Sequence, residues 1–217
     1  FPTRRSSDLT PHYIIGTEYN SNNSEKNKLI KELKNHTKIN LYIGNEVYID
    51  NNIFEYIKNR EISTLNTSRY LLVEFPLNEK MERATSIIFE LRSAGIIPVI
   101  AHPERYRYME LSDLENLIDQ GCLLQGNITS LCGKYGKNPK KNLELLIKKH
   151  MIHVLGTDTH KHVSHIDLCL KRLKKLVDKK MYNELISKNF DRIINDEDIE
   201  PYEIIYVGNI FKKEKLK

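Results

Sequence analysis

Residues 70–76, Tyr-Leu-Leu-Val-Glu-Phe-Pro, place a glutamate, Glu74, at the end of a short run of apolar residues. Such a run is typical of a strand that is buried on both faces, in a parallel sheet flanked by helices. An acidic side chain there is expected to be buried as well, and a buried carboxylate needs a cation or hydrogen-bond donors. The stretch therefore predicts a strand whose carboxyl end holds a functional acid.

The same pattern, an apolar run followed by a single His, Glu or Asp, recurs along the chain. It is found at Thr10-Pro-His12, Ile43-Gly-Asn-Glu46, Val99-Ile-Ala-His102 and Val154-Leu-Gly-Thr-Asp158-Thr-His160. Parallel strands end on one face of the sheet, where barrel and doubly wound enzymes build their sites. Six metal-competent side chains should then meet there: His12, Glu46, Glu74, His102, Asp158 and His160. The simplest interpretation is a metal-dependent hydrolase.

Single members of this set also allow simpler interpretations. His12 follows a proline and could be an ordinary loop histidine, and Glu46 could be an exposed acid at a strand end. Asp158 and His160 form an Asp-x-His pair, which suits a metal because alternate residues of an extended segment point to one side. The set as a whole is more specific than any member.

Helices and strands are expected to alternate along the chain. The predicted strands are 39–43, 69–75, 96–101, 122–125 and 153–155, and the predicted helices are 25–35, 51–58, 78–93, 112–120, 139–150 and 166–189. Ser112 is expected to cap its helix, and Gly121 to end it. This alternation predicts one α/β domain with mainly parallel strands.

Composition narrows the class of protein. The chain has 217 residues, of which 40% are hydrophobic, which is enough for one domain with a sizeable core. No apolar stretch approaches the roughly 18 residues of a membrane span, and the N-terminus has no apolar signal-peptide core, so we expect a cytoplasmic protein. The net charge of +5 owes much to Lys-rich stretches at 171–180 and 212–217. We interpret these as solvated faces and expect no nucleic-acid partner.

Motifs for several other chemistries are missing. The chain has no phosphate-binding Gly-rich loop, no dinucleotide fingerprint and no Gly-x-Ser-x-Gly elbow. The usual thiolate phosphatase mechanism needs an Arg six positions after a Cys, and the residues found there are Ile128, Asn138 and Lys175. Cys122, Cys132 and Cys169 are too few for a disulfide framework, so we expect ordinary thiols. We expect solvent or helix-dipole roles for His36, His150 and His153.

The first nine residues do not resemble the start of a protein. They include no initiating Met, and Phe-Pro-Thr-Arg-Arg-Ser-Ser-Asp-Leu matches one reading frame of a widely used sequencing adapter. We therefore expect residues 1–9 to be a non-native scar and leave them out of the predicted fold.

Six short motifs of this chain resemble those of a known family. The motifs are Thr-Pro-His12, Gly-Asn-Glu46-Val-Tyr, Val-Glu74-Phe-Pro, Ile-Ala-His102-Pro-Glu-Arg105-Tyr, Leu-Gln125-Gly-Asn127-Ile-Thr-Ser and Thr-Asp158-Thr-His160. From Thr10 to about Glu197 the chain is similar to the polymerase-and-histidinol-phosphatase (PHP) superfamily, and most closely to its bacterial tyrosine-protein phosphatase branch of the CpsB/YwqE type. The resemblance implies a distorted β/α barrel with three metals, usually manganese. It also implies a substrate, the tyrosine autokinases that control capsule and exopolysaccharide synthesis.

The resemblance also assigns roles. It makes the six side chains metal ligands and places Arg105 against the substrate phosphate, so that a metal-bridged hydroxide attacks phosphorus and a phenolate leaves. The expected catalytic residues are Arg105, His102 and His160, and the expected substrate contacts are Arg105, Lys161 and His165. Lys161 or His165 would replace a second Arg that many family members have after the Asp-x-His pair.

The family's opening His-x-His strand and nearby Asp have no counterpart in this chain. We therefore expect the first strand and helix to be missing, a phosphatase domain over residues 10–197, a basic tail over 198–217, and weak activity in the chain as it stands. Two alternatives remain open. One is another PHP phosphoesterase, either a small-molecule phosphatase similar to histidinol phosphatase or an exonuclease, and the other is an inactive binding protein. The oligomeric state is not indicated.

Overall fold

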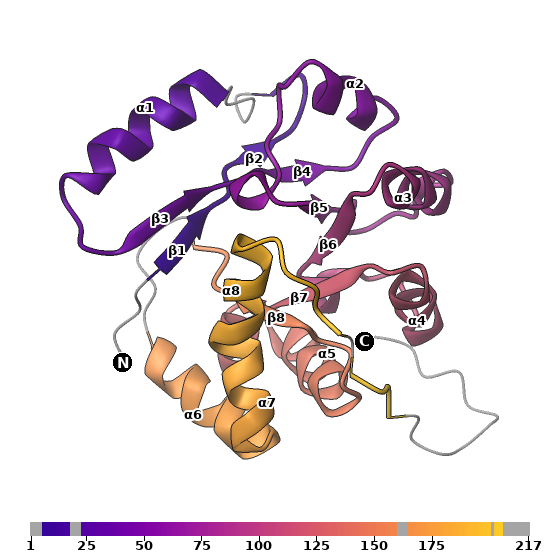
Figure 1. Ribbon diagram of the computed structural model, residues 1–217. Coiled ribbons are helices and arrows are strands. Elements are labelled where there is room, and N and C mark those ends of the chain that lie inside the picture. The colour runs from indigo at the N-terminus through magenta and orange to yellow at the C-terminus, as the bar shows by residue number, and fades with distance from the viewer. Residues whose placement is uncertain (1–5, 18–22, 160–164, 201, 206–217) are drawn as a thin grey trace.

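The computed structural model describes residues 6–17, 23–159, 165–200 and 202–205 (Figure 1). Within them, a curved sheet of six strands has the order β2-β4-β5-β6-β7-β8, and every neighbouring pair is parallel. The strands are β2 (His12–Tyr13), β4 (Glu46–Tyr48), β5 (Tyr70–Glu74), β6 (Ile97–Ala101), β7 (Leu123–Asn127) and β8 (Val154–Gly156). The expectation of an α/β fold with parallel strands is confirmed.

A second, two-stranded sheet precedes the main one. Its strands are β1 (Ser6–Leu9) and β3 (Asn40–Ile43), which pair in parallel. Residues 1–9 are not expected to belong to the fold, whereas Ser6–Leu9 form a strand in the structure. Strand pairing uses main-chain groups, which any extended segment offers. The predicted strand 39–43 is β3, and Glu46, expected at the end of that strand, instead begins a second strand, β4. The two strands are separated at Gly44, where a Cβ would lie 2.7 Å from Leu65 Cδ2.

Helices surround the curved sheet. Figure 1 shows α2 (Ile53–Lys58), α3 (Ala84–Ser93), α4 (Leu111–Asp119) and α5 (Lys137–Lys148) in an arc on its outer side, and α1 (Asn23–Lys34) beside β3. Three short 3-10 turns lie next to strands: η1 (Leu65–Thr67) precedes β5, η2 (Pro103–Arg105) follows β6 and η3 (Ile128–Cys132) follows β7. Among the described helices, none combines the length and apolar character needed to cross a membrane.

The chain after β8 forms several helices where one was expected over residues 166–189. These are α6 (Ile166–Leu176), α7 (Lys179–Asn183), the π-helical segment η4 (Glu184–Lys188) and α8 (Asn189–Ile194). Val177 is extended, and the Asp178 side chain accepts a hydrogen bond from Met181 N, so a new helix begins there. The expected Ser112 cap is also wrong. Glu110 is the N-cap of α4 and forms a capping box with Asp113, whereas Gly121 ends the helix with φ +83° as predicted.

Alternate strand residues build two separate cores. Leu71, Val73, Ile100 and Leu124 belong to the large cluster on the helix side of the sheet. Tyr70, Leu72, Val99, Ala101, Leu123 and Val154 belong to a smaller cluster on the concave side, which Ile193 of α8 joins. Both faces of these strands are thus buried, as their short apolar runs predict. Glu74 continues the concave series of β5, so its carboxylate points into the same interior as Leu72.

Two of the three cysteines form a disulfide. Cys132 at the end of η3 is bonded to Cys169 in α6, with a Cα–Cα distance of 5.5 Å, and Cys122 is a buried free thiol. The expectation of three ordinary thiols is therefore wrong for Cys132 and Cys169. They are 37 positions apart, and only the packing of α6 against η3 brings them together.

Candidate active site

His12 and Glu46 are neighbours in the sheet. They are register partners in β2 and β4. Two residues separate each of them from the end of the preceding strand, because β1 ends before Thr10-Pro11 and β3 ends before Gly44-Asn45. Asn45, which is fully buried, links these two short connections by a hydrogen bond. Its Nδ2 donates to Pro11 O at 3.2 Å, and its Oδ1 accepts from Lys26 Nζ. Burial lowers the pKa of Lys26 to about 8. The asparagine therefore fixes the relative position of the two candidate ligands.

His102 leaves the strand conformation directly after β6. Its φ of 34° lies in the left-handed region, which costs a non-glycine residue of the order of 1–3 kcal/mol and is concentrated at functional sites. The imidazole, only 4% exposed, has its Nε2 at 3.2 Å from Glu46 Oε1 and 3.2 Å from Glu74 Oε1. The strained backbone thus accompanies a ring that bridges two buried carboxylates.

His12 completes this cluster. Its Nδ1 lies 3.9 Å from Glu46 Oε2 and 3.6 Å from Glu74 Oε2. One ligand atom from each of His12, Glu46 and Glu74 can be chosen so that all lie within 4.8 Å of one another. We call His12, Glu46, Glu74 and His102 the His/Glu cluster.

The His/Glu cluster perturbs its own protonation. Burial disfavours the charged form of His102, but hydrogen bonds to Glu46 and Glu74 outweigh burial and raise its pKa to about 9. Burial acts to raise the pKa of Glu74, and the hydrogen bond and charge of His102, with smaller contributions from His12 and Arg105, lower it overall. Strongly perturbed groups gathered in one place are typical of functional sites.

Arg105 and Asp158 form a second group beside this cluster. Arg105 Nη1 donates to Asp158 Oδ2 at 3.0 Å, and the same oxygen accepts from Tyr135 OH at 2.9 Å and from Asn127 Nδ2 at 3.0 Å. The Arg105 guanidinium lies over the Tyr135 ring, 4.5 Å from its centroid. Lys134 Nζ donates to Asp158 O at 3.2 Å. Arg105 is thereby held beside the cluster, and its charge acts on the pKa values of Glu74 and His102.

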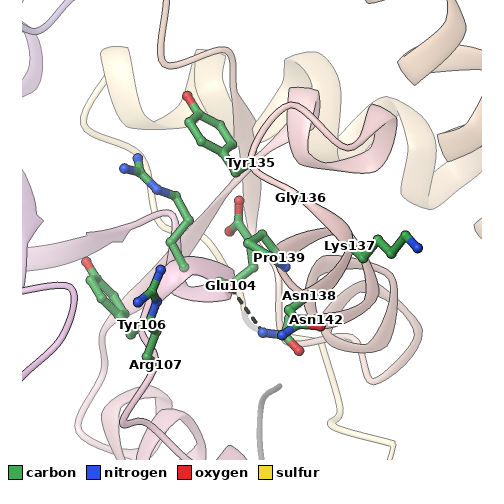
Figure 2. A pocket seen from close by; sticks show the side chains of 10 residues that line it. Glu104, Tyr106, Arg107, Tyr135, Gly136, Lys137, Asn138, Pro139 and Asn142 are labelled. Atoms are coloured by element: carbon green, nitrogen blue, oxygen red, sulfur yellow. Dashed lines mark hydrogen bonds between the residues drawn. The ribbon is translucent and has the colours of Figure 1, made fainter.

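Glu104, between His102 and Arg105, has a structural position. It is 1% exposed, and its Oε1 accepts from Ser130 Oγ at 2.7 Å and from Asn127 N at 3.2 Å. Asn142 Nδ2 donates to Glu104 O at 3.1 Å (Figure 2). Burial raises the pKa of the Glu104 carboxyl. Glu104 therefore ties the loop after β6 to β7 and α5, and the acid that pairs with Arg105 is Asp158.

The structure brings together four of the six sequence-predicted ligands, namely the His/Glu cluster. Asp158 lies against Arg105, and its φ of 44° takes it out of the extended conformation on which the Asp-x-His argument relied. His160 and Lys161 lie outside the described residues. His165 is exposed, has φ 64° and precedes α6, where its carbonyl accepts from Leu168 N.

The sequence interpretation missed three residues of the site. Asn127, Lys134 and Tyr135 all contact Asp158, yet none is among the predicted ligands or substrate contacts. The position of Asn127 at the end of β7 is the same signal that indicates the acids and imidazoles at the other strand ends. Tyr135 comes from a loop, and no sequence signal indicates its contact.

The arrangement is suited to a hard cation. Two carboxylates and two imidazoles are ligands that divalent metals accept, at about 2.0–2.2 Å. Ligand atoms at that distance lie about 3.0 Å apart in an octahedron and about 3.4 Å apart in a tetrahedron. The nitrogen–oxygen separations of 3.2, 3.2, 3.6 and 3.9 Å in the His/Glu cluster are close to these ligand–ligand distances. The donor set fits a metal.

Comparison with known proteins identifies relatives along most of the chain. Putative tyrosine-protein phosphatase CapC of Staphylococcus aureus is 39% identical over 203 residues, covering 88% of this chain and 78% of the relative. Tyrosine-protein phosphatase YwqE of Bacillus subtilis is 29% identical, covering 68% of this chain and 63% of the relative. Tyrosine-protein phosphatase CpsB of Streptococcus pneumoniae is 33% identical, covering 54% and 51%.

The fold has a counterpart among solved structures as well. One crystal structure, from work on YwqE of Bacillus subtilis and CpsB of Streptococcus pneumoniae that describes them as metal-dependent tyrosine phosphatases, superposes with a TM-score of 0.84 and 27% identity. The match covers 94% of this chain and 86% of the other. The sequence model of the family described as "Capsular polysaccharide synthesis, CpsB/CapC" matches residues 6–195. This chain belongs to the CpsB/CapC family.

Proposed function

We propose that this chain is a metal-dependent phosphatase that hydrolyses phosphotyrosine on a protein substrate. The observation that carries the proposal is the convergence of His12, Glu46, Glu74 and His102, with ligand atoms 3.2–3.9 Å apart and Arg105 beside them. The named relatives are tyrosine-protein phosphatases, which supports the same reaction class.

The His/Glu cluster would hold the metal, with Asp158 and His160 as further ligands of the multi-metal site implied by the family resemblance. A bound divalent cation would activate water at neutral pH and offset phosphoryl charge. Manganese is the metal we propose. In the absence of metal, the proton on His102 Nε2 faces Glu46 and Glu74 and offsets the repulsion between these carboxylates. Metal binding must therefore displace this proton.

Arg105 is proposed to bind the phosphoryl group. Its guanidinium has five N–H donors in a planar fork, which matches phosphoryl oxygens better than an ammonium does. Asp158 and the Tyr135 ring hold that fork in one orientation, which reduces the entropy lost when substrate binds. Lys134 joins Lys161 and His165 as a candidate for the second positive charge, because its ammonium contacts both Asp158 and Tyr135.

The leaving group favours phosphotyrosine. A phenol has a pKa of about 10, so its oxyanion leaves more readily than a serine alkoxide and depends less on a general acid. We propose a bacterial tyrosine autokinase of capsule or exopolysaccharide synthesis as the substrate, in line with the family description. The proposed catalytic unit is residues 10–197.

A cytoplasmic location is also a proposal, checked by cell fractionation. Disulfides are rare in the cytosol, so the redox state of Cys132 and Cys169 in cells bears directly on it.

The experiment is a substrate panel with matched carboxamide variants. We expect Mn²⁺-dependent hydrolysis of a phosphotyrosine peptide that exceeds hydrolysis of a phosphoserine peptide, histidinol phosphate and single-stranded DNA, and that EDTA abolishes. Glu74→Gln should lower turnover by roughly a hundredfold or more. Glu90→Gln is the control, because Glu90 is exposed on α3 and its recorded ion pair is with Arg83 at 3.8 Å. Hydrolysis that EDTA and Glu74→Gln leave unchanged contradicts the proposal, and so does a preference for histidinol phosphate or DNA.

A further inference from the structure

A cavity of about 690 Å³ opens beside η2 and the first turn of α5. Figure 2 shows the side chains that line it, which include Arg107 from the loop after η2, Tyr135 from the loop before α5, and Lys137 and Asn142 from α5. Arg105 lines it too. No residue of the His/Glu cluster lines this cavity.

The charge of the cavity is positive. Arg105, Arg107 and Lys137 line it, and the acid among its lining residues is Glu104. The Glu104 carboxyl is buried, and its Oε1 is already bonded to Ser130 and Asn127, so the exposed charge comes from the cations. Arg107 and Lys137 are exposed, and neither makes an ion pair within the part of the chain that the structure describes. Two cations are therefore available to an incoming anion.

The cavity adjoins the proposed phosphate site. Arg105 and Tyr135 line the cavity, and both donate to Asp158 Oδ2, at 3.0 and 2.9 Å. Successive residues of an extended peptide are about 3.3 Å apart, so a peptide whose phosphate contacts Arg105 would bring its neighbouring residues into the cavity. Whatever flanks the phosphotyrosine would then face Arg107 and Lys137.

We infer that this cavity is a second anion subsite, which binds an acidic side chain flanking the phosphotyrosine, and that Arg107 and Lys137 determine this specificity. The inference rests on the proposed phosphotyrosine phosphatase function and deepens it. A carboxylate gains from both cations, whereas a lysine at the same place is repelled. Because both cations are exposed, the preference weakens as salt screens it.

The test compares three peptides with the same central phosphotyrosine, flanked on both sides by Glu, by Gln or by Lys. We expect kcat/KM to fall in the order Glu, Gln, Lys, with about a three- to tenfold preference for Glu over Gln at low salt, the range expected for two exposed ion pairs. Arg107→Ala and Lys137→Ala should each reduce the Glu/Gln ratio. Lys58→Ala, at an exposed position in the last turn of α2, is the matched control and should leave the ratio unchanged.

A charge reversal removes misfolding as an explanation. The double variant Arg107→Glu/Lys137→Glu should prefer the Lys-flanked peptide, a gain that loss of structure cannot produce. Equal kcat/KM for the Glu and Gln peptides, or a Glu/Gln ratio that the variants do not change, overturns the inference and leaves the proposed function standing. Failure of the wild-type chain to hydrolyse both the peptides and p-nitrophenyl phosphate, which has no flanking residues, overturns the proposed function and the inference with it.

Discussion

Acidification should destabilise the protein through His153. This residue precedes β8 and is 1% exposed; its Nδ1 accepts from Leu124 N at 3.0 Å, so the ring hydrogen is on Nε2. Burial lowers its pKa to about 4. A second proton would have to go on Nδ1, where it would face the Leu124 N–H. The expected solvent or helix-dipole role for His153 is therefore wrong.

The magnitude follows from the two protonation states. Between pH 6.5 and pH 4 the unfolded chain binds a proton at His153 and the folded chain does not, so the free energy of unfolding falls as pH falls through this window. The fall of the His153 pKa from 6.5 to about 4 corresponds to about 3 kcal/mol when complete, and to about 2 kcal/mol at pH 5. The pH dependence that His102 contributes to the free energy of unfolding has the opposite sign. Its raised pKa stabilises the metal-free fold below pH 6.5, and this contribution is lost between pH 6.5 and about 9, outside the His153 window.

The assay is urea denaturation in EDTA at pH 7.5 and pH 5 for the wild type and for His153→Gln, whose amide oxygen can still accept from Leu124 N. The wild type should lose about 2 kcal/mol more than the variant between the two pH values. An equal loss in both proteins refutes the reasoning. An NMR titration of the His153 ring with a midpoint near 6.5 would refute it independently of the variant.

Three further changes test other parts of the account. Arg105→Lys should lower turnover on phosphotyrosine peptide roughly tenfold with unchanged metal content, because lysine loses the fork; unchanged turnover makes Arg105 a structural partner of Asp158. Tyr135→Phe should cost about 1–2 kcal/mol in urea denaturation, since it removes the hydroxyl bonded to Asp158 and keeps the ring under Arg105. Reduction of Cys132–Cys169 should lower the free energy of unfolding by up to about 4 kcal/mol, because the bond closes a loop of 37 residues in the unfolded chain. The number of thiols titrated in the denatured chain should rise from one to three on reduction, and three thiols before reduction would contradict the disulfide.

The features that could be predicted from sequence are those set by local periodicity. The runs before Glu74 and His102 are strands buried on both faces, and both side chains reach the cluster. Acids and imidazoles at strand ends can be recognised in the sequence because each comes where an apolar run ends. Gly121 ended its helix as expected, because a left-handed residue there is a local requirement.

The features that could not be predicted depend on tertiary contacts. The Asp158 backbone is left-handed, so the alternation of side-chain directions along β8 does not continue through Asp158. Tyr135 reaches Asp158 from a loop 23 positions earlier, and Cys169 meets Cys132 only because α6 packs on η3. The burial of His153, which is 1% exposed, has no local sequence signal, and the amide of Asn189 in α8 donates to its carbonyl oxygen at 2.7 Å.

The most direct test of the central claim is Mn²⁺ binding, measured by the loss of the free Mn²⁺ EPR signal at pH 7.5. The account predicts that the wild type binds Mn²⁺, and that Glu46→Gln and Glu74→Gln each weaken binding at least tenfold, because each removes a charged ligand of the His/Glu cluster. Glu90→Gln should bind as the wild type does. Mn²⁺ binding that is absent from the wild type, or equal in all four proteins, would contradict a metal site at His12, Glu46, Glu74 and His102.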